Sequence, residues 1–322
     1  MSLTSHLKDP RSSVTRFMRE QFPNVGAIRP AWREQVGHPR TIRPREDPIG
    51  HWSTLGTAID YRLRYYFPAP PEGRSFVASH GIATLSRVFI QNSHGRLNAE
   101  LWRRLGGEFV ASLAAVEAKA SSGARLSRAL EDRLCRHCFV LALFEQLFRA
   151  GTQIGSALFT LPVEATVSDL LDLAVAPLVA DLRAMSWAFY DGFADLLARP
   201  AVLNPTFDGS LDVGGADADL IVDGCLLEVK TTVDPRALPS KVVYQLLGYV
   251  LLDYSNEFVI DSVGFYLARQ AILVRWPLGE LLTGIVGRRV SLPRLRREFR
   301  TLLGGDHHRQ RRRGVRPVLS PG

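Results

Sequence analysis

The 322-residue sequence has few cysteines and lysines and no long apolar run. No stretch approaches the roughly 18 consecutive apolar residues of a membrane-spanning helix, and the N-terminus, MSLTSHLKDPRSSV, lacks the apolar core of a secretory signal. Three cysteines cannot form an even disulfide framework, which is typical of a reducing compartment. We therefore expect a cytoplasmic protein with no membrane partner. The ATP-binding pattern Gly-x-x-x-x-Gly-Lys-Ser/Thr is also absent, so any motor ATPase would be a separate protein partner.

Basic residues exceed acidic ones. The net charge is +8 and the pI is about 9.7, which favours an acidic partner such as nucleic acid. Of the 40 basic residues, only four are lysines and 36 are arginines. A lysine at a candidate site is therefore more informative here than an arginine would be.

The chain before residue 201 is predicted to consist of an irregular N-terminal segment and a longer helical region. Residues 1–48 are rich in Pro, Arg and Ser and are expected to form an irregular arm. Within a helical region at 49–200, the stripe Leu55, Ile59, Leu63 and Phe67 predicts a helix at 53–67, capped by Ser53 or Thr54 and ended by Pro68. Further helices are predicted at 101–119, 126–150, 167–182 and 185–197.

The composition changes at Asn204-Pro205 to Gly, Asp and short β-branched or apolar runs, a pattern typical of strands and turns. Over 201–278 the predicted order is β-β-β-α-β-β, with strands at 263–267 and 272–276. The fold class is therefore α/β (α+β) with a helical subdomain. Residues 279–322 are predicted to form an Arg-rich helix followed, from His307, by a disordered basic tail.

One segment of the strand region predicts a β-hairpin. Asp223-Gly224 lies between two apolar runs and suits a type I′ turn, which needs positive φ at both central positions. Counting outward from the turn gives the register. The expected cross-strand pairs are Val222 with Cys225, Ile221 with Leu226, Leu220 with Leu227, Asp219 with Glu228, and Asp217 with Lys230.

This register places Asp219 and Glu228 side by side. Opposite side chains in an antiparallel pair share a face, with Cβ atoms roughly 4.5 to 5.5 Å apart, and two such carboxylates repel each other unless a cation lies between them. Mg²⁺ suits the position because it accepts one or two carboxylates, keeps several waters and shares its shell with a phosphate. Lys230 lies on the same face, where its amine can hold the attacking water or a phosphate oxygen.

A helix is predicted at 242–253, capped by Ser240 after Pro239. Lys241, Gln245 and Tyr249 are four residues apart and form one polar stripe between apolar positions. If this helix packs beside the hairpin, the stripe borders the two acids and can contact the substrate backbone.

The arrangement resembles the PD-(D/E)XK nuclease superfamily and, within it, the RecB-type branch. The matching elements are Asp219 on one hairpin strand, Glu228-Val229-Lys230 on the next, and Gln245 to Tyr249 on the following helix. RecB-type proteins also begin their core with a Gly-x-x-x-His helix, and Gly56 to Asp60 is similar to it, with Asp in place of His. The resemblance covers residues 204–278 and would add the helix at 53–67 to the core.

The resemblance implies a restriction-endonuclease-like core with a mixed central sheet and a deoxyribonuclease activity, acting in DNA repair or in defence against foreign DNA. Metal-activated water would hydrolyse the phosphodiester, with Mg²⁺ or Mn²⁺ as cofactor. RNA is not excluded as a substrate. The implied catalytic residues are Asp219, Glu228 and Lys230; the metal ligands Asp219, Glu228, the backbone carbonyl of Val229 and Asp60; and the substrate-side residues Gln245, Tyr249, Lys241 and Asp217.

Simpler interpretations remain open for these residues. The hairpin can be a solvent-facing one with an Asp217–Lys230 ion pair, and Gln245 and Tyr249 can belong to the exposed face of a helix. Asp60 and Arg64 have the spacing of an ordinary i, i+4 ion pair.

Two further groups lie in the helical region. Glu145 is a candidate acid facing the metal from a helix. Cys135 and Cys138 have the spacing of half a zinc or iron–sulfur site, but the sequence has no second pair or trio of cysteines, so they are predicted to be core residues.

Two other functions compete with the nuclease. One is a non-catalytic nucleic-acid-binding protein that retains a nuclease-like fold. The other is a structural subunit whose helical region binds a protein partner. The sequence leaves open the oligomeric state and whether cleavage is endo- or exonucleolytic.

Overall fold

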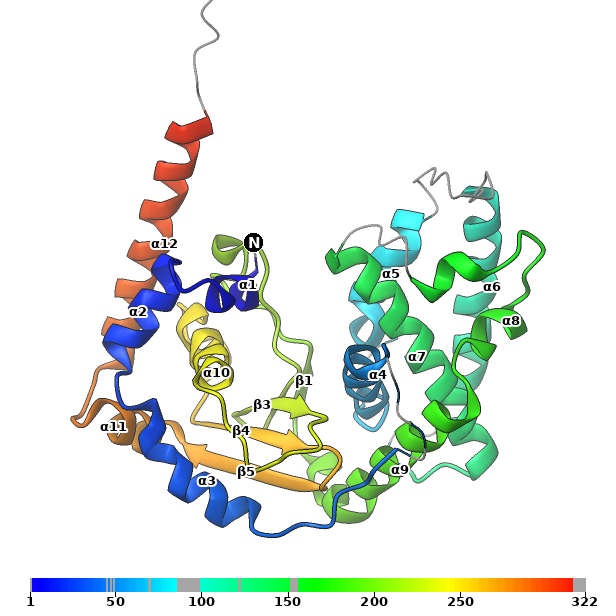
Figure 1. Ribbon diagram of the computed structural model, residues 1–322, viewed down its shortest axis with the longest axis horizontal. Coiled ribbons are helices and arrows are strands. Elements are labelled where there is room, and N and C mark those ends of the chain that lie inside the picture. The colour runs from blue at the N-terminus through cyan, green and yellow to red at the C-terminus, as the bar shows by residue number, and fades with distance from the viewer. Residues whose placement is uncertain are drawn as a thin grey trace, which may run out of the picture.

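The computed structural model arranges the chain in two bodies (Figure 1). One contains a β-sheet covered by helices from both ends of the chain, and the other contains the helices between residues 52 and 198. The residues that the structure describes are 2–44, 46, 48, 50–68, 71–85, 99–120, 123–150 and 156–314.

The sheet has five strands in the order β1-β2-β3-β4-β5, with β3 and β4 parallel and the other neighbours antiparallel. The helix α10 (Ser240–Leu252) connects the two parallel strands. The predicted order β-β-β-α-β-β and the mixed α/β class are therefore confirmed. The strands are β1 (Ala201–Leu203), β2 (Leu220–Val222), β3 (Cys225–Lys230), β4 (Ser262–Leu267) and β5 (Ile272–Pro277).

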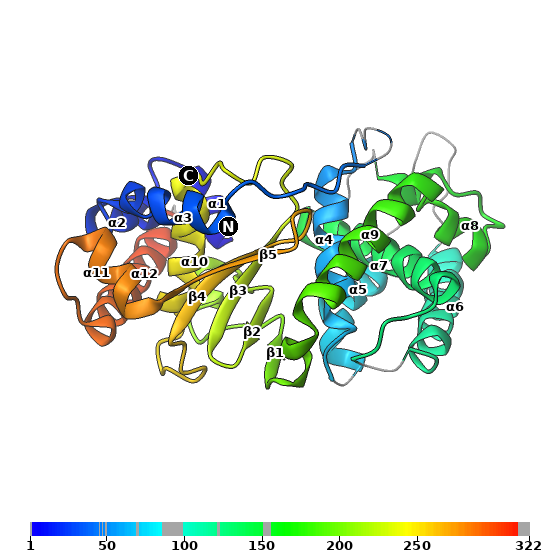
Figure 2. The same ribbon diagram turned by 90° about the horizontal axis from the view of Figure 1, so that it is seen from below.

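The two faces of the sheet belong to two different hydrophobic cores. Because successive side chains of a strand point to opposite faces, Leu227 packs with the helical body, whereas Ile221 and Leu226 pack with α10. Glu228 and Lys230 follow Leu226 at intervals of two and therefore lie on the α10 face. Figure 2 shows the helical body beyond β1, at one end of the sheet.

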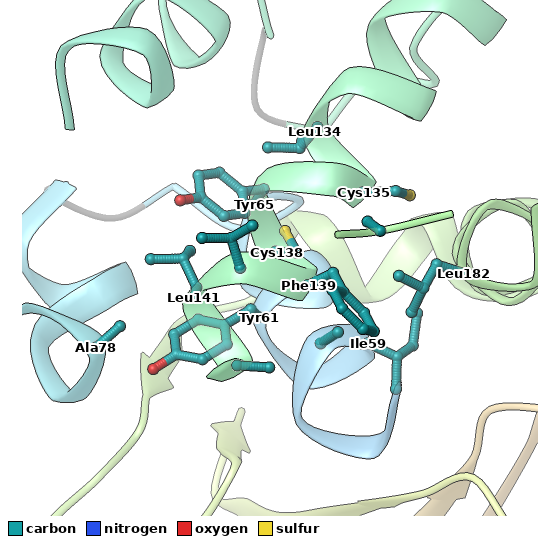
Figure 3. Close-up of a cluster of buried hydrophobic side chains, with 14 of the residues drawn as sticks. Ile59, Tyr61, Tyr65, Ala78, Leu134, Cys135, Cys138, Phe139, Leu141 and Leu182 are labelled. Carbon is teal, nitrogen blue, oxygen red and sulfur yellow. The ribbon is translucent and has the colours of Figure 1, made fainter. Parts of the chain in front are cut away.

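The helical body packs around α4 and α7, which run side by side. Figure 3 shows its core, in which Ile59 and Tyr61 of α4 and Tyr65 directly after it meet Cys138 and Phe139 of α7. Its helices are α4 (Trp52–Arg64), α5 (Pro71–Leu85), α6 (Ala99–Glu117), α7 (Arg128–Ala150), η2 (Ala157–Thr160), α8 (Val167–Asp172), α9 (Ala176–Phe193) and η3 (Ala194–Ala198).

The expectation of an irregular arm at 1–48 is wrong for residues 3–36, whereas the described residues from 37 to 48 are irregular as expected. Residues 3–36 form short helices whose apolar residues, among them Leu3, Met18 and Trp32, are buried in the same core as α10. Short helices are stabilised mainly by such packing rather than by their own propensity. They are α1 (Leu3–Lys8), α2 (Ser13–Gln21), η1 (Val25–Ile28) and α3 (Arg29–Val36).

Several predicted boundaries also differ. The N-cap positions of α4 and α10 are His51 and Pro239, without a side-chain cap, so the predicted caps at Ser53 or Thr54 and at Ser240 are wrong. The helix predicted at 167–182 is interrupted after Asp172, and α9 then runs through the break predicted near 183.

At the C-terminal side, α11 (Leu278–Val286) is followed by α12 (Leu292–Gly314). The prediction of a disordered tail from residue 307 is therefore wrong for 307–314, while 315–322 lie outside the described residues. Across the described part of the chain, no helix combines the length and the hydropathy that crossing a membrane requires.

Candidate functional site

A cavity of about 420 Å³ opens where the two bodies meet. Its wall combines the start of α1, one side of α4, the end of α7, the β2–β3 hairpin and α10. The residues that line it include Thr57, Asp60, Arg64, Glu145, Arg149, Asp217, Asp219, Glu228, Val229, Lys230, Gln245 and Tyr249.

The hairpin forms as predicted. Asp223 and Gly224 have φ values of 50° and 77°, as a type I′ turn requires, and the three pairs from Val222–Cys225 to Leu220–Leu227 are confirmed. Beyond them, one carboxylate oxygen of Asp219, Oδ2, accepts a 2.7 Å hydrogen bond from the backbone N–H of Val229. Asp219 is thereby fixed beside Glu228, and both acids line the cavity.

Asp217 does not face Lys230 in an ion pair. The chain before Asp219 leaves β3 and forms a bridge between Asp217 and Thr206. The Asp217 carboxylate instead accepts two hydrogen bonds from Arg149, of 2.9 and 2.5 Å, and so joins the hairpin to α7. The predicted Asp217–Lys230 cross-strand pair is therefore wrong.

Glu228 is a buried acid with one unused oxygen. Its side chain is 3% exposed, and Oε2 accepts a 2.6 Å hydrogen bond from Nζ of Lys230. Its Oε1 is buried without a hydrogen-bond partner. Burial, and secondly the negative charge of Asp219, raise the pKa of Glu228 to about 7. Such an oxygen fits a bound cation, which would supply the missing partner.

The pKa values of Asp219 and Lys230 are also shifted by burial and by neighbouring charges. Burial raises the pKa of Asp219, although Lys230 opposes the shift. For Lys230, burial alone would lower the pKa, but the charges of Glu228 and Asp219 outweigh it and the pKa rises. The amine is therefore held in its charged form beside two acids whose protonation burial favours.

Asp60 lines the same cavity from α4 and is 8% exposed. It forms the predicted i, i+4 ion pair with Arg64, which also donates to Oδ1 of Asn204 at 3.2 Å. Burial still raises the pKa of Asp60 well above its ordinary value, against the effect of Arg64, and Asp219 adds to the increase. The ion pair is confirmed, and the role of Asp60 as a ligand stays a prediction.

The polar stripe of α10 is only partly at the cavity. Gln245 donates a 2.8 Å hydrogen bond to the hydroxyl of Tyr249, and both residues line the cavity. Tyr249 is 4% exposed, so it does not belong to the exposed face of a helix. Lys241 is exposed and lies outside the cavity lining.

Sequence reasoning missed part of the wall. Ser2, Leu3 and Thr4 line the cavity, and the N–H of Leu3 donates to the carbonyl of Gly215 at 3.1 Å. The capping position of Ser2 before α1 was the local signal for this helix, but nothing in the sequence indicates where α1 docks.

Arg149 was also missed. Its Nε donates to Oε1 of Glu145 at 2.7 Å, while Tyr61 donates to Oε2 of Glu145 at 2.5 Å. Both oxygens of Glu145 are thus engaged within the helical body, and its role as a metal-facing acid stays a prediction. The i, i+4 spacing of Glu145 and Arg149 was a usable sequence signal.

The cysteines of α7 lie in the core, as predicted. Cys135 and Cys138 are fully buried (Figure 3), and burial raises the pKa of the Cys135 thiol well above its ordinary value. A protonated, buried thiol is a poor metal ligand.

Within the described ranges, no group of three or more His, Cys, Asp or Glu side chains is placed to hold a metal ion by itself. Asp219 and Glu228 would supply part of a coordination shell. This donor set of two carboxylates suits Mg²⁺, which usually keeps several waters and takes further oxygens from a substrate phosphate. No family model, curated protein or solved structure matches the chain.

Proposed function

We propose that this protein is a divalent-metal-dependent nuclease with an active site of the PD-(D/E)XK type, which hydrolyses phosphodiester bonds of DNA. The observation that carries the proposal is the buried Oε1 of Glu228, which has no hydrogen-bond partner and lies beside a second acid, Asp219, and the amine of Lys230. A purely structural cluster would be expected to satisfy that oxygen.

Asp219, Glu228 and the backbone carbonyl of Val229 would hold Mg²⁺ or Mn²⁺, with Asp60 as a further candidate ligand. When bound, the metal lowers the pKa of water and neutralises charge on the phosphoryl oxygens. The side chains of the protein would contribute by holding the attacking water and the substrate in position.

Lys230 is placed to orient the attacking water or a phosphate oxygen, because its charged amine already lies 2.6 Å from the Glu228 carboxylate. Tyr249 and Gln245 border the acids from α10 and can contact the substrate backbone. Low solvent exposure around these groups strengthens their interaction with a phosphate.

The first test compares Lys230→Ala with Lys119→Ala. Lys119 is an exposed lysine just after α6 and lines neither the cavity nor its rim. Single-stranded DNA, duplex DNA and RNA are tested in turn, and we expect Mg²⁺- or Mn²⁺-dependent cleavage of DNA by the wild type and by Lys119→Ala. Lys230→Ala should lose at least about a hundredfold in rate, as expected for a group that positions the attacking water.

Cleavage that persists in EDTA, or full activity of Lys230→Ala, would contradict the proposed mechanism. DNA binding without cleavage by any variant or metal would instead indicate a non-catalytic nucleic-acid-binding protein.

A further inference from the structure

A second cavity of about 870 Å³ adjoins the candidate active site. It extends along α4, α7 and η2 and reaches Lys8 at the end of α1. Four residues line both cavities: Ser53, Thr57, Glu145 and Arg149. The two cavities therefore share a boundary that these four residues form.

The two cavities differ in charge. The first contains five acids, Asp60, Glu145, Asp217, Asp219 and Glu228, against the cations Arg64, Arg149 and Lys230. Among the described residues that line the second, Glu145 is the only acid, and Tyr61 and Arg149 already donate to its two oxygens. The other polar lining residues carry cationic, hydroxyl, imidazole and amide groups: Lys8, His51, Ser53, Thr54, Thr57, Gln146, Arg149, Ser156 and Thr160. Groups of this kind can donate hydrogen bonds to phosphate oxygens; of these, Thr57, Gln146 and Thr160 already donate to protein acceptors.

Arg149 stands at the boundary with its side chain 43% exposed. Its guanidinium binds the Asp217 carboxylate through two hydrogen bonds, and the same fork geometry binds a phosphate. Its three nitrogens already donate to Asp217 and Glu145, so a phosphate at the exposed part of this side chain would share the guanidinium with these two acids.

We propose that the two cavities form one continuous groove for single-stranded nucleic acid. The scissile phosphate would lie over Asp219 and Glu228, and the following phosphates at Arg149 and Lys8. The volumes favour a single strand, because cavities of roughly 300 to 1,000 Å³ hold ligands of small-molecule size and cannot enclose a duplex. Grooves that track one backbone with cations are the usual solution for single-strand binding. This inference rests on the proposed function for the place of the scissile phosphate.

The test uses two changes in the second cavity that leave the first intact. Lys8→Glu reverses the cation at the far end, and Thr160→Trp fills the cavity from an exposed position on its rim. Lys119→Glu is the matched charge-reversal control outside both cavities. Binding of a short fluorescein-labelled single strand and of the corresponding duplex is measured by anisotropy in the Lys230→Ala background, in which turnover is expected to be lost.

We expect both changes to weaken single-strand binding about tenfold or more, while Lys119→Glu leaves it unchanged and the duplex binds more weakly than the single strand. With Lys230 intact, hydrolysis of the small diester bis(p-nitrophenyl) phosphate should be the same in Lys8→Glu, Thr160→Trp and the wild type, because this substrate needs only the first cavity.

Unchanged single-strand binding in Thr160→Trp overturns the groove; if that variant does not fold, unchanged binding in Lys8→Glu does so. Duplex binding as tight as single-strand binding overturns it as well. Absence of hydrolysis of any substrate by the wild type contradicts the proposed nuclease but leaves the anisotropy result to decide the groove. The two failures are thus distinguishable.

Discussion

Glu228 is held in surroundings that oppose its charge. Burial and the adjacent Asp219 raise its pKa from 4.5 to about 7, so the ionised side chain destabilises the folded protein relative to the protonated one. A cation bound beside Glu228 would offset this cost. A residue that weakens the fold in the absence of its ligand is typical of a functional site.

Glu228→Gln should therefore stabilise the metal-free protein. At about pH 8 in EDTA, we expect the free energy of unfolding to rise by on the order of 2 to 3 kcal/mol, because glutamine resembles the protonated acid. Urea denaturation measures the change, with Glu34→Gln on the exposed side of α3 as control. The same variant should lose nuclease activity. A less stable Glu228→Gln protein would show that the Lys230 ion pair outweighs burial.

The stabilisation that Glu228→Gln gives to the metal-free protein should increase with pH. The folded-state pKa of Glu228 lies above the unfolded value of 4.5, so the folded protein binds this proton more tightly. That contribution to stability is present below about pH 4.5 and is lost as the pH rises through about 7. The difference in unfolding free energy between Glu228→Gln and wild type should thus be near zero at low pH and grow towards pH 8.

At the scale of elements, the helical body depends on a close contact between α5 and α7. A Cβ atom added at Gly81 of α5 would lie 2.0 Å from the backbone carbonyl oxygen of Phe144. Only glycine lets the two helix backbones approach this closely.

Gly81→Ala should destabilise the protein by about 1 to 3 kcal/mol, because the helices must move apart. Gly107→Ala on α6 is the matched control: nothing lies within 4 Å of its added Cβ, and the better helix propensity of alanine should stabilise by about 0.5 to 1 kcal/mol. Thermal unfolding followed by circular dichroism compares the two. Equal stability of the two variants would mean that α5 does not pack on α7 in this way.

The elements that the sequence predicted well are those with local causes. The Asp223-Gly224 turn sets the hairpin register within a few residues, and short apolar runs define β4 and β5. By contrast, the helices of residues 1–48 are short and owe their stability to docking on the α10 core. No local pattern encodes that docking, nor the departure of Asp217 from the hairpin.

The same distinction applies to the candidate site. Asp219, Glu228 and Lys230 could be grouped from the sequence because one turn relates them. Arg149 could not, because its contact with Asp217 spans 68 positions and forms only when the two bodies meet. Charge and spacing alone predict such long-range pairs poorly.

At the scale of the whole molecule, a metal bound at the junction of the two bodies should stabilise their common fold. A ligand that binds only the folded state at about 100 times its Kd adds about 2.7 kcal/mol. We expect Mg²⁺ or Mn²⁺ to raise the melting temperature of the wild type by a few degrees and EDTA to reverse the increase. Asp219→Asn should abolish the effect, and an equal rise in that variant would place the metal elsewhere.

The cavity wall begins at Ser2 and is not complete until Tyr249. A fragment limited to residues 201–278 would keep the hairpin and its acids but would lack α1, α4 and α7, so water would reach Glu228 from the open side. Hydration would then lower the pKa of Glu228 towards its ordinary value. The unfavourable energy of its charged form, which favours a bound cation, would decrease. The buried, acidic surroundings of Glu228 thus depend on contacts between the two bodies of the molecule.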